Sequence, residues 1–112
     1  MTKTFIQTNE FSRRWDKLGF TDDDLRRLEW EILSNPKIGD VIPGTGKLRK
    51  MRFAFVDRGK RSSTRVCYVD FVIAETVYLI TVYAKNEKDN LSMEECRKIK
   101  SMIDILGKSL GE

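Results

Sequence analysis

The sequence predicts one α+β domain over residues 1–112, with a mostly antiparallel four-stranded sheet, an N-terminal helical hairpin on one face and a C-terminal helix. Three observations predict it. Residues 9–34 repeat apolar side chains at helical spacing, residues 47–84 are rich in alternating and β-branched residues, and helical spacing returns after residue 92. The expected order of elements is β-α-α-β-β-β-α.

The N-terminal third is expected to form a strand and two helices. Lys3–Thr8 should be the strand, and Asn9 should cap a first helix that ends at Gly19. In the second helix, the hydroxyl of Thr21 should accept a hydrogen bond from the backbone N–H of Asp24. The side chains that face the core in this hairpin are Phe11, Trp15, Leu18, Leu25, Leu28 and Ile32.

The second strand candidate carries the most informative pattern. An irregular connection over residues 35–47 holds both prolines and three of the seven glycines, and the strand Lys47–Phe55 follows. Its apolar residues alternate with Lys50 and Arg52, so one face should feed the core while the other presents cations. The apolar members of this alternation are Met51, Phe53 and Phe55.

Two central strands and a helix should complete the domain. Thr64–Ile73 and Thr76–Ala84 are apolar almost throughout, which is typical of strands covered on both faces, with Ala74-Glu75 as the tight turn between them. The final helix should begin at a capping box formed by Ser92 and Glu95 and end near Leu106. Gly107 and Gly111 are expected to mark its fraying end.

The charge of the chain is concentrated in one segment. Lys47–Arg65 contains eight basic residues and one acid, a charge of +7 against a total of +4, which leaves −3 for the rest. A basic cluster on a slightly acidic body is a footprint for a polyanion, although a solvated basic loop would give the same composition. The basic residues are Lys47, Arg49, Lys50, Arg52, Arg58, Lys60, Arg61 and Arg65.

Several chemistries are excluded by what the sequence lacks. It contains no histidine, which removes Ser-His-Asp and Cys-His nucleophiles and imidazole-based ribonuclease sites. Residues 44–47 (GTGK) do not have phosphate-loop spacing. Cys67 and Cys96 lie far apart in apolar patterns and are expected to be buried free thiols. We therefore expect no metal and no cofactor.

No segment of the sequence indicates a membrane or an export signal. No apolar run approaches the length of a membrane span, and the N-terminus lacks the apolar stretch of a signal peptide. We therefore expect a cytoplasmic protein without a membrane partner.

Lysine and arginine on rigid strands are sufficient for one kind of catalysis. Such a cluster can bind phosphates and stabilise the extra negative charge of a pentavalent phosphorane. A lysine among other cations can serve as a proton acceptor near neutral pH. RNA supplies its own nucleophile, the 2′-OH, so an enzyme without histidine or metal can cleave it.

Three segments resemble one family. They are NPKIGDVIPGTGKLRKMR at 35–52, GKRSSTRVCY at 59–68 and VYAKNEKDNLS at 82–92, in the same order and at matching spacing. Together they resemble the RelE/ParE superfamily of toxins, and within it the HigB-like branch. The resemblance implies the toxin of a type II toxin–antitoxin pair, an mRNA endonuclease that works on the ribosome without metal.

The resemblance also implies roles for individual residues. Lys50 and Arg52 match the basic pair that serves as general base and phosphate contact. Arg65 matches the arginine that stabilises transition-state charge. Lys85 falls at the end of the last strand, where the family places basic residues of the catalytic site. RNA contacts are expected from Arg49, Lys60, Arg61 and Asn86. The tyrosine that RelE uses after that strand would fall near Leu91 here and is missing. Two readings stay open: Tyr83 or Tyr68 takes its place, or both tyrosines only pack within the sheet.

The implied partners are a HigA-like helix-turn-helix antitoxin, the ribosome with its mRNA, and operator DNA through the antitoxin only. Two other functions stay open: a ParE-like toxin that acts on DNA gyrase, and a non-catalytic RNA-binding module. The antitoxin is expected to bind the exposed faces of the two N-terminal helices, which carry Arg13, Arg14, Arg26, Arg27 and Trp30. For Trp30, a position in the core is equally expected.

Overall fold

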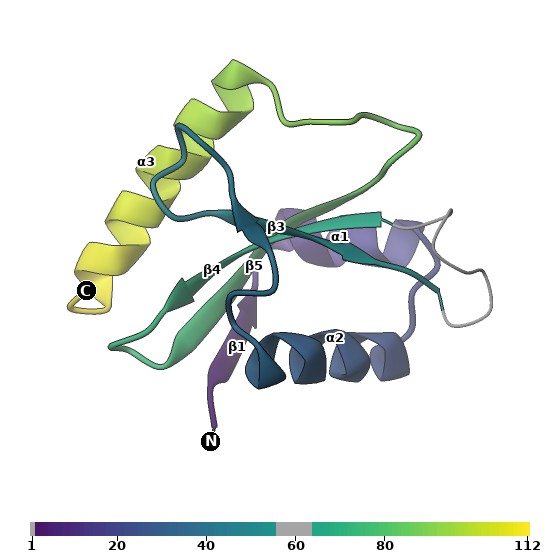
Figure 1. The fold of residues 1–112 in the computed structure, drawn as a ribbon, viewed down its shortest axis with the longest axis horizontal. Coiled ribbons are helices and arrows are strands. Elements are labelled where there is room, and N and C mark those ends of the chain that lie inside the picture. Colours follow the sequence, from purple (N-terminus) through teal and green to yellow (C-terminus); the bar gives the residue numbers. More distant parts are fainter. Residues whose placement is uncertain (1, 56–63) are drawn as a thin grey trace.

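The computed structural model describes residues 2–55 and 64–112 and confirms the α+β class (Figure 1). Its helices are α1 (Asn9–Lys17), α2 (Asp22–Ser34) and α3 (Met93–Ser109). Its strands are β1 (Thr4–Gln7), β2 (Asp40–Val41), β3 (Arg49–Phe53), β4 (Thr64–Phe71) and β5 (Thr76–Ala84). Within these described residues, no helix has both the length and the apolarity needed to cross a membrane.

The sheet is mixed and five-stranded, which corrects the expected count of four. Its order is β1-β5-β4-β3-β2, and β1 runs parallel to β5 while the other pairs are antiparallel. The additional strand, β2, lies in the segment 35–47 that was expected to be irregular. It has two exposed residues, so it leaves no alternation in the sequence.

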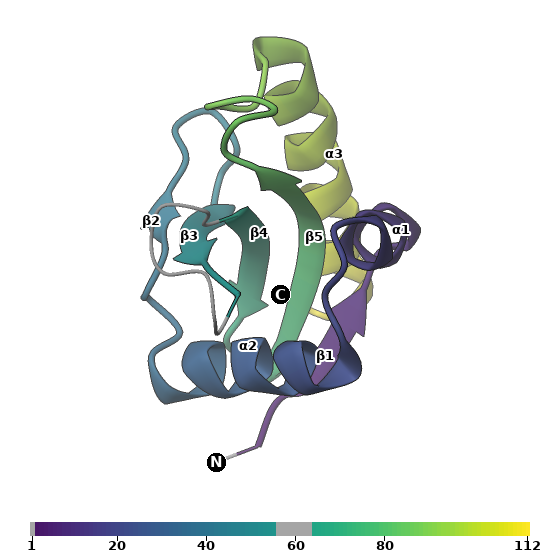
Figure 2. The same ribbon diagram turned by 90° about the vertical axis from the view of Figure 1, so that its right-hand side faces the viewer.

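Helices cover both faces of the sheet (Figures 1 and 2). On one face, α1 and α2 pack Phe11, Trp15 and Ile32 against Val66 and Tyr68 of β4. On the other face, α3 packs against the alternate residues of β4 and β5. That second cluster consists of Leu48, Cys67, Val69, Phe71, Ile80, Tyr83, Ile99 and Ile103. The continuous apolarity of these two strands is therefore explained by coverage on both faces, as expected.

The N-terminal caps follow the sequence with one correction. The cap of α1 is Thr8 and not Asn9, because the hydroxyl of Thr8 accepts from the backbone N–H of Phe11 at 3.0 Å and Asn9 is already helical. At α2 the expected capping is confirmed: Thr21 accepts from Asp24 N–H, and Asp24 accepts from Thr21 N–H at 2.8 Å. The hydrogen bond from the Thr21 backbone N–H to the Asp24 carboxylate lowers the pKa of Asp24.

The last helix is longer than expected. Its capping box between Ser92 and Glu95 is confirmed, but the helix continues to Ser109 and carries Gly107 inside it. Gly107 is buried, and a Cβ there would lie 3.4 Å from the ring of Phe71. Gly107 therefore packs against Phe71 inside the helix and does not mark a frayed end.

The β4–β5 connection is also wider than expected. Strand β4 ends at Phe71, and a turn over Val72–Glu75 leads into β5. The backbone N–H of Glu75 donates to Val72 O at 3.2 Å, and Glu75 has a positive φ of 49°. The predicted tight Ala74-Glu75 turn is thus the second half of a four-residue turn.

Candidate active site

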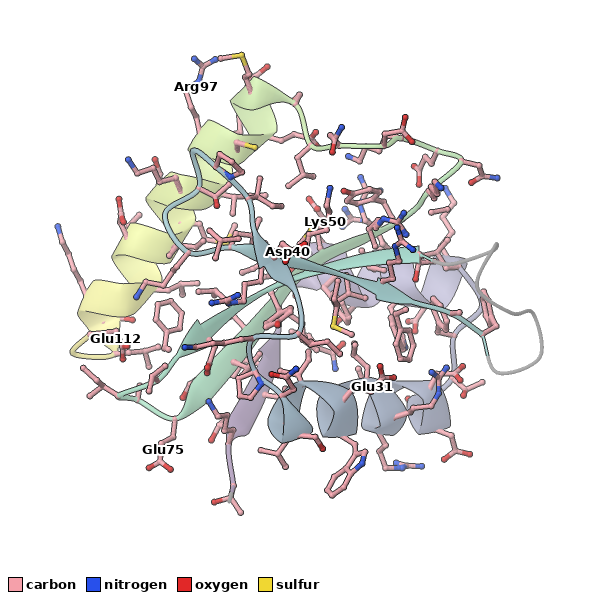
Figure 3. All side chains as sticks on the ribbon, in the orientation of Figure 1. Glu31, Asp40, Lys50, Glu75, Arg97 and Glu112 are labelled. Carbon is pink, nitrogen blue, oxygen red and sulfur yellow. The ribbon has the colours of Figure 1, made fainter. Side chains whose placement is uncertain are left out.

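Three of the predicted cations meet in one cleft. Lys50 and Arg52 of β3 and Arg65 of β4 line a cleft of about 550 Å³ together with Ile38, Asp40 and Met51. Figure 3 shows Lys50 and Asp40 near each other where β2 meets β3, and the two residues are paired in register. The arrangement follows from strand alternation, because Lys50 and Arg52 point away from the face where Met51 and Phe53 join the α1–α2 core.

Among the described residues, the contacts of α3 on β4 lie away from the Arg65 end of that strand. It packs on Cys67, Val69 and Phe71 of β4, whereas Arg65 lies at the beginning of that strand. The sheet face is therefore divided into an apolar part under α3 and a cationic part beside it. A ligand can reach the cationic part without displacing the core.

Two arginines face each other within the cleft. Arg52 pairs directly with Arg65 across β3 and β4. Arg52 is exposed, but Arg65 is only 9% exposed. Like charges directly opposite each other repel and raise the local positive potential. An anion bound between the two side chains would relieve this repulsion, so the pair favours anion binding.

The segment between β5 and α3 also reaches the cleft. The Lys50 Nζ donates a hydrogen bond to Asn90 Oδ1 at 3.0 Å. Lys88 Nζ donates to Glu95 Oε2 at 2.8 Å and lies 5.1 Å from the centre of the Tyr83 ring. The hydrogen bond from Lys88 lowers the pKa of Glu95, so this carboxylate is ionised at neutral pH and fixes the lysine.

A second hydrogen-bond network supports the wall of the cleft. The backbone N–H of Gly39 donates to the Tyr68 hydroxyl at 3.1 Å, and that hydroxyl donates to Pro36 O at 2.7 Å. The Arg49 Nη1 donates to Gly39 O at 2.7 Å. These bonds come from the face opposite Lys50 and hold β2 against β3. They assign Tyr68 to support of the cleft and account for the position of Arg49.

Gly39 is the tightest point of this wall, and Gly39→Ala is expected to disturb it. A Cβ at residue 39 would lie 2.8 Å from the backbone oxygen of Lys50, closer than a carbon atom can approach. We expect a loss of unfolding free energy of about 1–3 kcal/mol, as in overpacked sites, measured by urea titration. Asp40→Ala, an exposed neighbour, is the control. Equal stability of both variants would show that the backbone around residue 39 shifts to accommodate the added methyl group.

The comparison with solved structures gives the fold a name. A solved structure of the E. coli toxin RelE, a double arginine-to-alanine mutant in the free state, matches with a TM-score of 0.63. The match covers 88% of this chain and 97% of that chain, with 21% sequence identity. The chain has a RelE-like fold. No family model matches the sequence.

On the RelE-like fold, the predicted site residues separate into three groups. Lys50, Arg52 and Arg65 converge on the cleft. Arg49 points to the opposite side of β3, while Lys85 and Asn86 are exposed just after β5 and do not line the cleft. Lys60 and Arg61 lie outside the residues that the structure describes. The catalytic role expected for Lys85 stays a prediction. The same holds for the RNA contacts expected from Arg49, Lys60, Arg61 and Asn86.

Neither alternative tyrosine presents its hydroxyl to the cleft. Tyr83 is fully buried beneath α3, and its hydroxyl has no hydrogen-bond partner among the described residues. Burial raises the pKa of Tyr83 to about 12. The Tyr68 hydroxyl is engaged with Gly39 and Pro36. The arrangement favours packing for both side chains.

The two cysteines are free, but only one is fully buried. Cys67 lies opposite Lys50 in the sheet, and burial raises the pKa of its thiol to about 12, so it stays protonated at neutral pH. Cys96 is half-buried. Across residues 2–55 and 64–112, no group of three or more histidine, cysteine or acidic side chains is placed to hold a metal ion.

Sequence reasoning missed Lys88, Asn90 and Asp40. The first two belong to KNEKDNLS, a segment already singled out, but their approach to Lys50 and Tyr83 depends on how the loop after β5 returns over the sheet. Asp40 is the first residue of β2, a strand too short to show a pattern. The sequence did offer one signal for Lys88, because it is a second basic residue only three positions after Lys85.

Proposed function

We propose that the protein is the toxin of a type II toxin–antitoxin pair and that it cleaves mRNA on the ribosome. The observation that carries this proposal is the convergence of Lys50, Arg52 and Arg65 on one cleft of a RelE-like fold. A protein of this fold is named a toxin, which supports the first half of the proposal. The clustered cations support the second half, because a phosphodiester is the anion that they fit best.

In the proposed reaction the RNA provides the nucleophile. The Lys50 amine accepts the proton of the 2′-OH, the 2′-oxygen attacks the adjacent phosphorus, and the bond from phosphorus to the 5′-oxygen breaks. The products are a cyclic phosphate and a free 5′-hydroxyl. Arg52 and Arg65 bind the phosphate oxygens from two strands and stabilise the added negative charge of the phosphorane. No cofactor is needed for this sequence of steps.

The leaving 5′-oxygen needs a proton, and Lys88 is the candidate donor. It is held by Glu95 next to Tyr83, which pairs with Arg65 across β4 and β5. Its Nζ lies beside the ring of Tyr83, the residue that pairs with Arg65, which supports a role for Lys88 near the Arg65 end of the site. Lys85 is the other candidate, on the resemblance alone.

The finer identity of the proposed toxin rests on the three sequence segments. They favour a HigB-like protein whose partner is a HigA-like helix-turn-helix antitoxin, with operator DNA bound through that antitoxin. The cleft favours an RNA-cleaving protein over a ParE-like one, because a gyrase inhibitor has no use for paired phosphate-binding arginines.

Induced expression tests the proposal. We expect growth arrest and cuts in mRNA within translated regions. We also expect purified protein to cut ribosome-bound mRNA when Mg²⁺ is present only at the level that keeps the ribosome assembled and no other metal is added, since no step uses a metal. Cut positions are read by primer extension. Growth arrest with intact mRNA and loss of DNA supercoiling would instead identify a ParE-like toxin. RNA binding without either effect would identify a non-catalytic module.

A further inference from the structure

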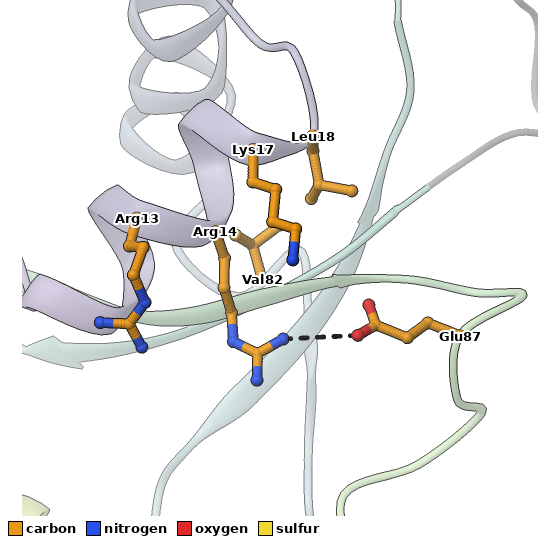
Figure 4. Close-up of a pocket in the computed structure, with 6 residues that line it drawn as sticks. All are labelled: Arg13, Arg14, Lys17, Leu18, Val82 and Glu87. Carbon is orange, nitrogen blue, oxygen red and sulfur yellow. Dashed lines mark ion pairs between the residues drawn. The ribbon is translucent and has the colours of Figure 1, made fainter.

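A second basic groove lies on the other face of the sheet. It is lined by Arg13, Arg14, Lys17, Leu18, Val82 and Glu87 and has a volume of about 470 Å³. Figure 4 shows the three cationic side chains extending from α1 on the side where Val82 and Glu87 lie. Nothing in the proposed cleavage chemistry uses this groove.

The groove is built for an anion. Glu87 is the one acid among the described residues that line the groove. It pairs with Arg14 at 3.7 Å and is half exposed, and ion pairs of this kind are readily replaced. The Arg14 Nε also forms an ion pair, with Glu10 at 3.6 Å. Both ion pairs of Arg14 are longer than a hydrogen bond, so an anionic oxygen in the groove can compete with the two carboxylates for the guanidinium.

The spacing of the cations suits a nucleic-acid strand. Arg13 and Lys17 are four residues apart on α1, which separates them by about 6 Å along the helix axis. Successive phosphates of one strand are separated by a similar length. Two cations and the Arg14 fork can therefore bind neighbouring phosphates of the same strand.

The groove and the cleft lie at the same end of β5. Val82 lines the groove, and the next residue, Tyr83, pairs with Arg65 of the cleft. The loop after β5 contacts both sites, through Glu87 with Arg14 and through Asn90 with Lys50. An RNA particle larger than a single strand can therefore contact the two cationic sites from the two sides of the sheet end.

We propose that the α1 groove is a second, non-catalytic phosphate-binding site that docks structured RNA of the ribosome while the cleft holds the mRNA. This inference rests on the proposed function and adds a substrate-docking surface to it. It predicts that the groove controls affinity and leaves the chemical step unchanged.

The test compares wild-type protein with Arg13→Ala/Lys17→Ala. Both side chains are exposed on a helix, where alanine is well tolerated. We expect binding to purified ribosomes to weaken about tenfold at moderate salt, and the slope of log affinity against log salt to fall by about two. The single-turnover cleavage rate at saturating ribosomes should stay within about twofold of wild type.

The matched control is Lys100→Ala/Lys108→Ala, which removes the same charge from exposed positions of α3. If both double variants show the same slope and affinity, only net charge matters and the docking site is wrong. If the α1 variant binds ribosomes normally but binds the antitoxin weakly, the groove is a protein-binding surface and the proposal is again overturned. Failure of wild-type protein to cleave would refute the proposed function, whereas the binding slopes would still decide on the groove.

Discussion

Arg65→Ala should slow single-turnover cleavage of ribosome-bound mRNA by a factor on the order of 10²–10³, the usual effect of losing one donor to the transition state. Arg65 lines the cleft from β4 and pairs with Arg52 of β3. The two guanidinium groups would therefore bind the same phosphate. Affinity for the ribosome should change much less than the rate, because the charge to be stabilised develops in the transition state.

The structure changes the control for this experiment. Arg65 is only 9% exposed, so its removal can also cost stability. Arg65→Lys keeps the charge and loses the planar fork, and should recover only part of the rate. Thermal unfolding of both variants separates the two effects. A folded Arg65→Ala protein that cleaves at the wild-type rate would remove Arg65 from the site.

Local patterns predicted most of the fold because their causes are local. The alternation around Lys50 and Arg52 is a direct consequence of the strand pleat, and it placed both side chains on the correct face. The capping boxes at Thr21 and Ser92 depend on four consecutive residues, and both are present. These features could be derived without knowledge of the partner elements.

The rest depended on contacts between distant segments. Strand β2 exists because residues 40–41 lie beside β3, held by bonds from Tyr68 and Arg49 to the Gly39 backbone. Gly107 looks like a helix stop in the sequence, but it lies inside α3 and packs against the ring of Phe71. Neither pairing leaves a periodic trace in the sequence, so neither could be predicted from it.

The same limit applies to the site. Strand alternation placed Lys50 and Arg52 on one face in the prediction, and the family resemblance added Arg65. The structure shows that Arg65 lies on the neighbouring strand, paired with Arg52. Lys88 and Asn90 approach through a loop, whose path is set by the ion pair to Glu95 and the bond to Lys50. Sequence reasoning could mark the loop as part of the site but could not select its residues.

Trp30→Ala should weaken binding of the proposed antitoxin about 30-fold or more, the effect of losing an aromatic anchor at an interface. The sequence left this side chain equally divided between core and surface. In the structure Trp30 is 67% exposed on α2, with Arg26 exposed one turn before it. An exposed indole next to a guanidinium is typical of protein interfaces, and its removal should leave the stability of the toxin nearly unchanged.

The structure also selects the companion variant. Arg27 donates to Ala54 O at 2.7 Å and lies over the Phe53 ring at 4.1 Å, so changing it would disturb the fold. Arg26→Glu tests the charge of the surface alone. Affinities are measured by calorimetry with the helix-turn-helix protein that we expect beside the gene. If Trp30→Ala and Arg26→Glu both bind it like wild type while Lys50→Ala does not, the antitoxin covers the catalytic cleft directly. If Trp30→Ala loses binding and Lys50→Ala keeps it, the antitoxin inhibits by its bulk, because a protein seated on α2 leaves the cleft open and still prevents entry into the ribosome.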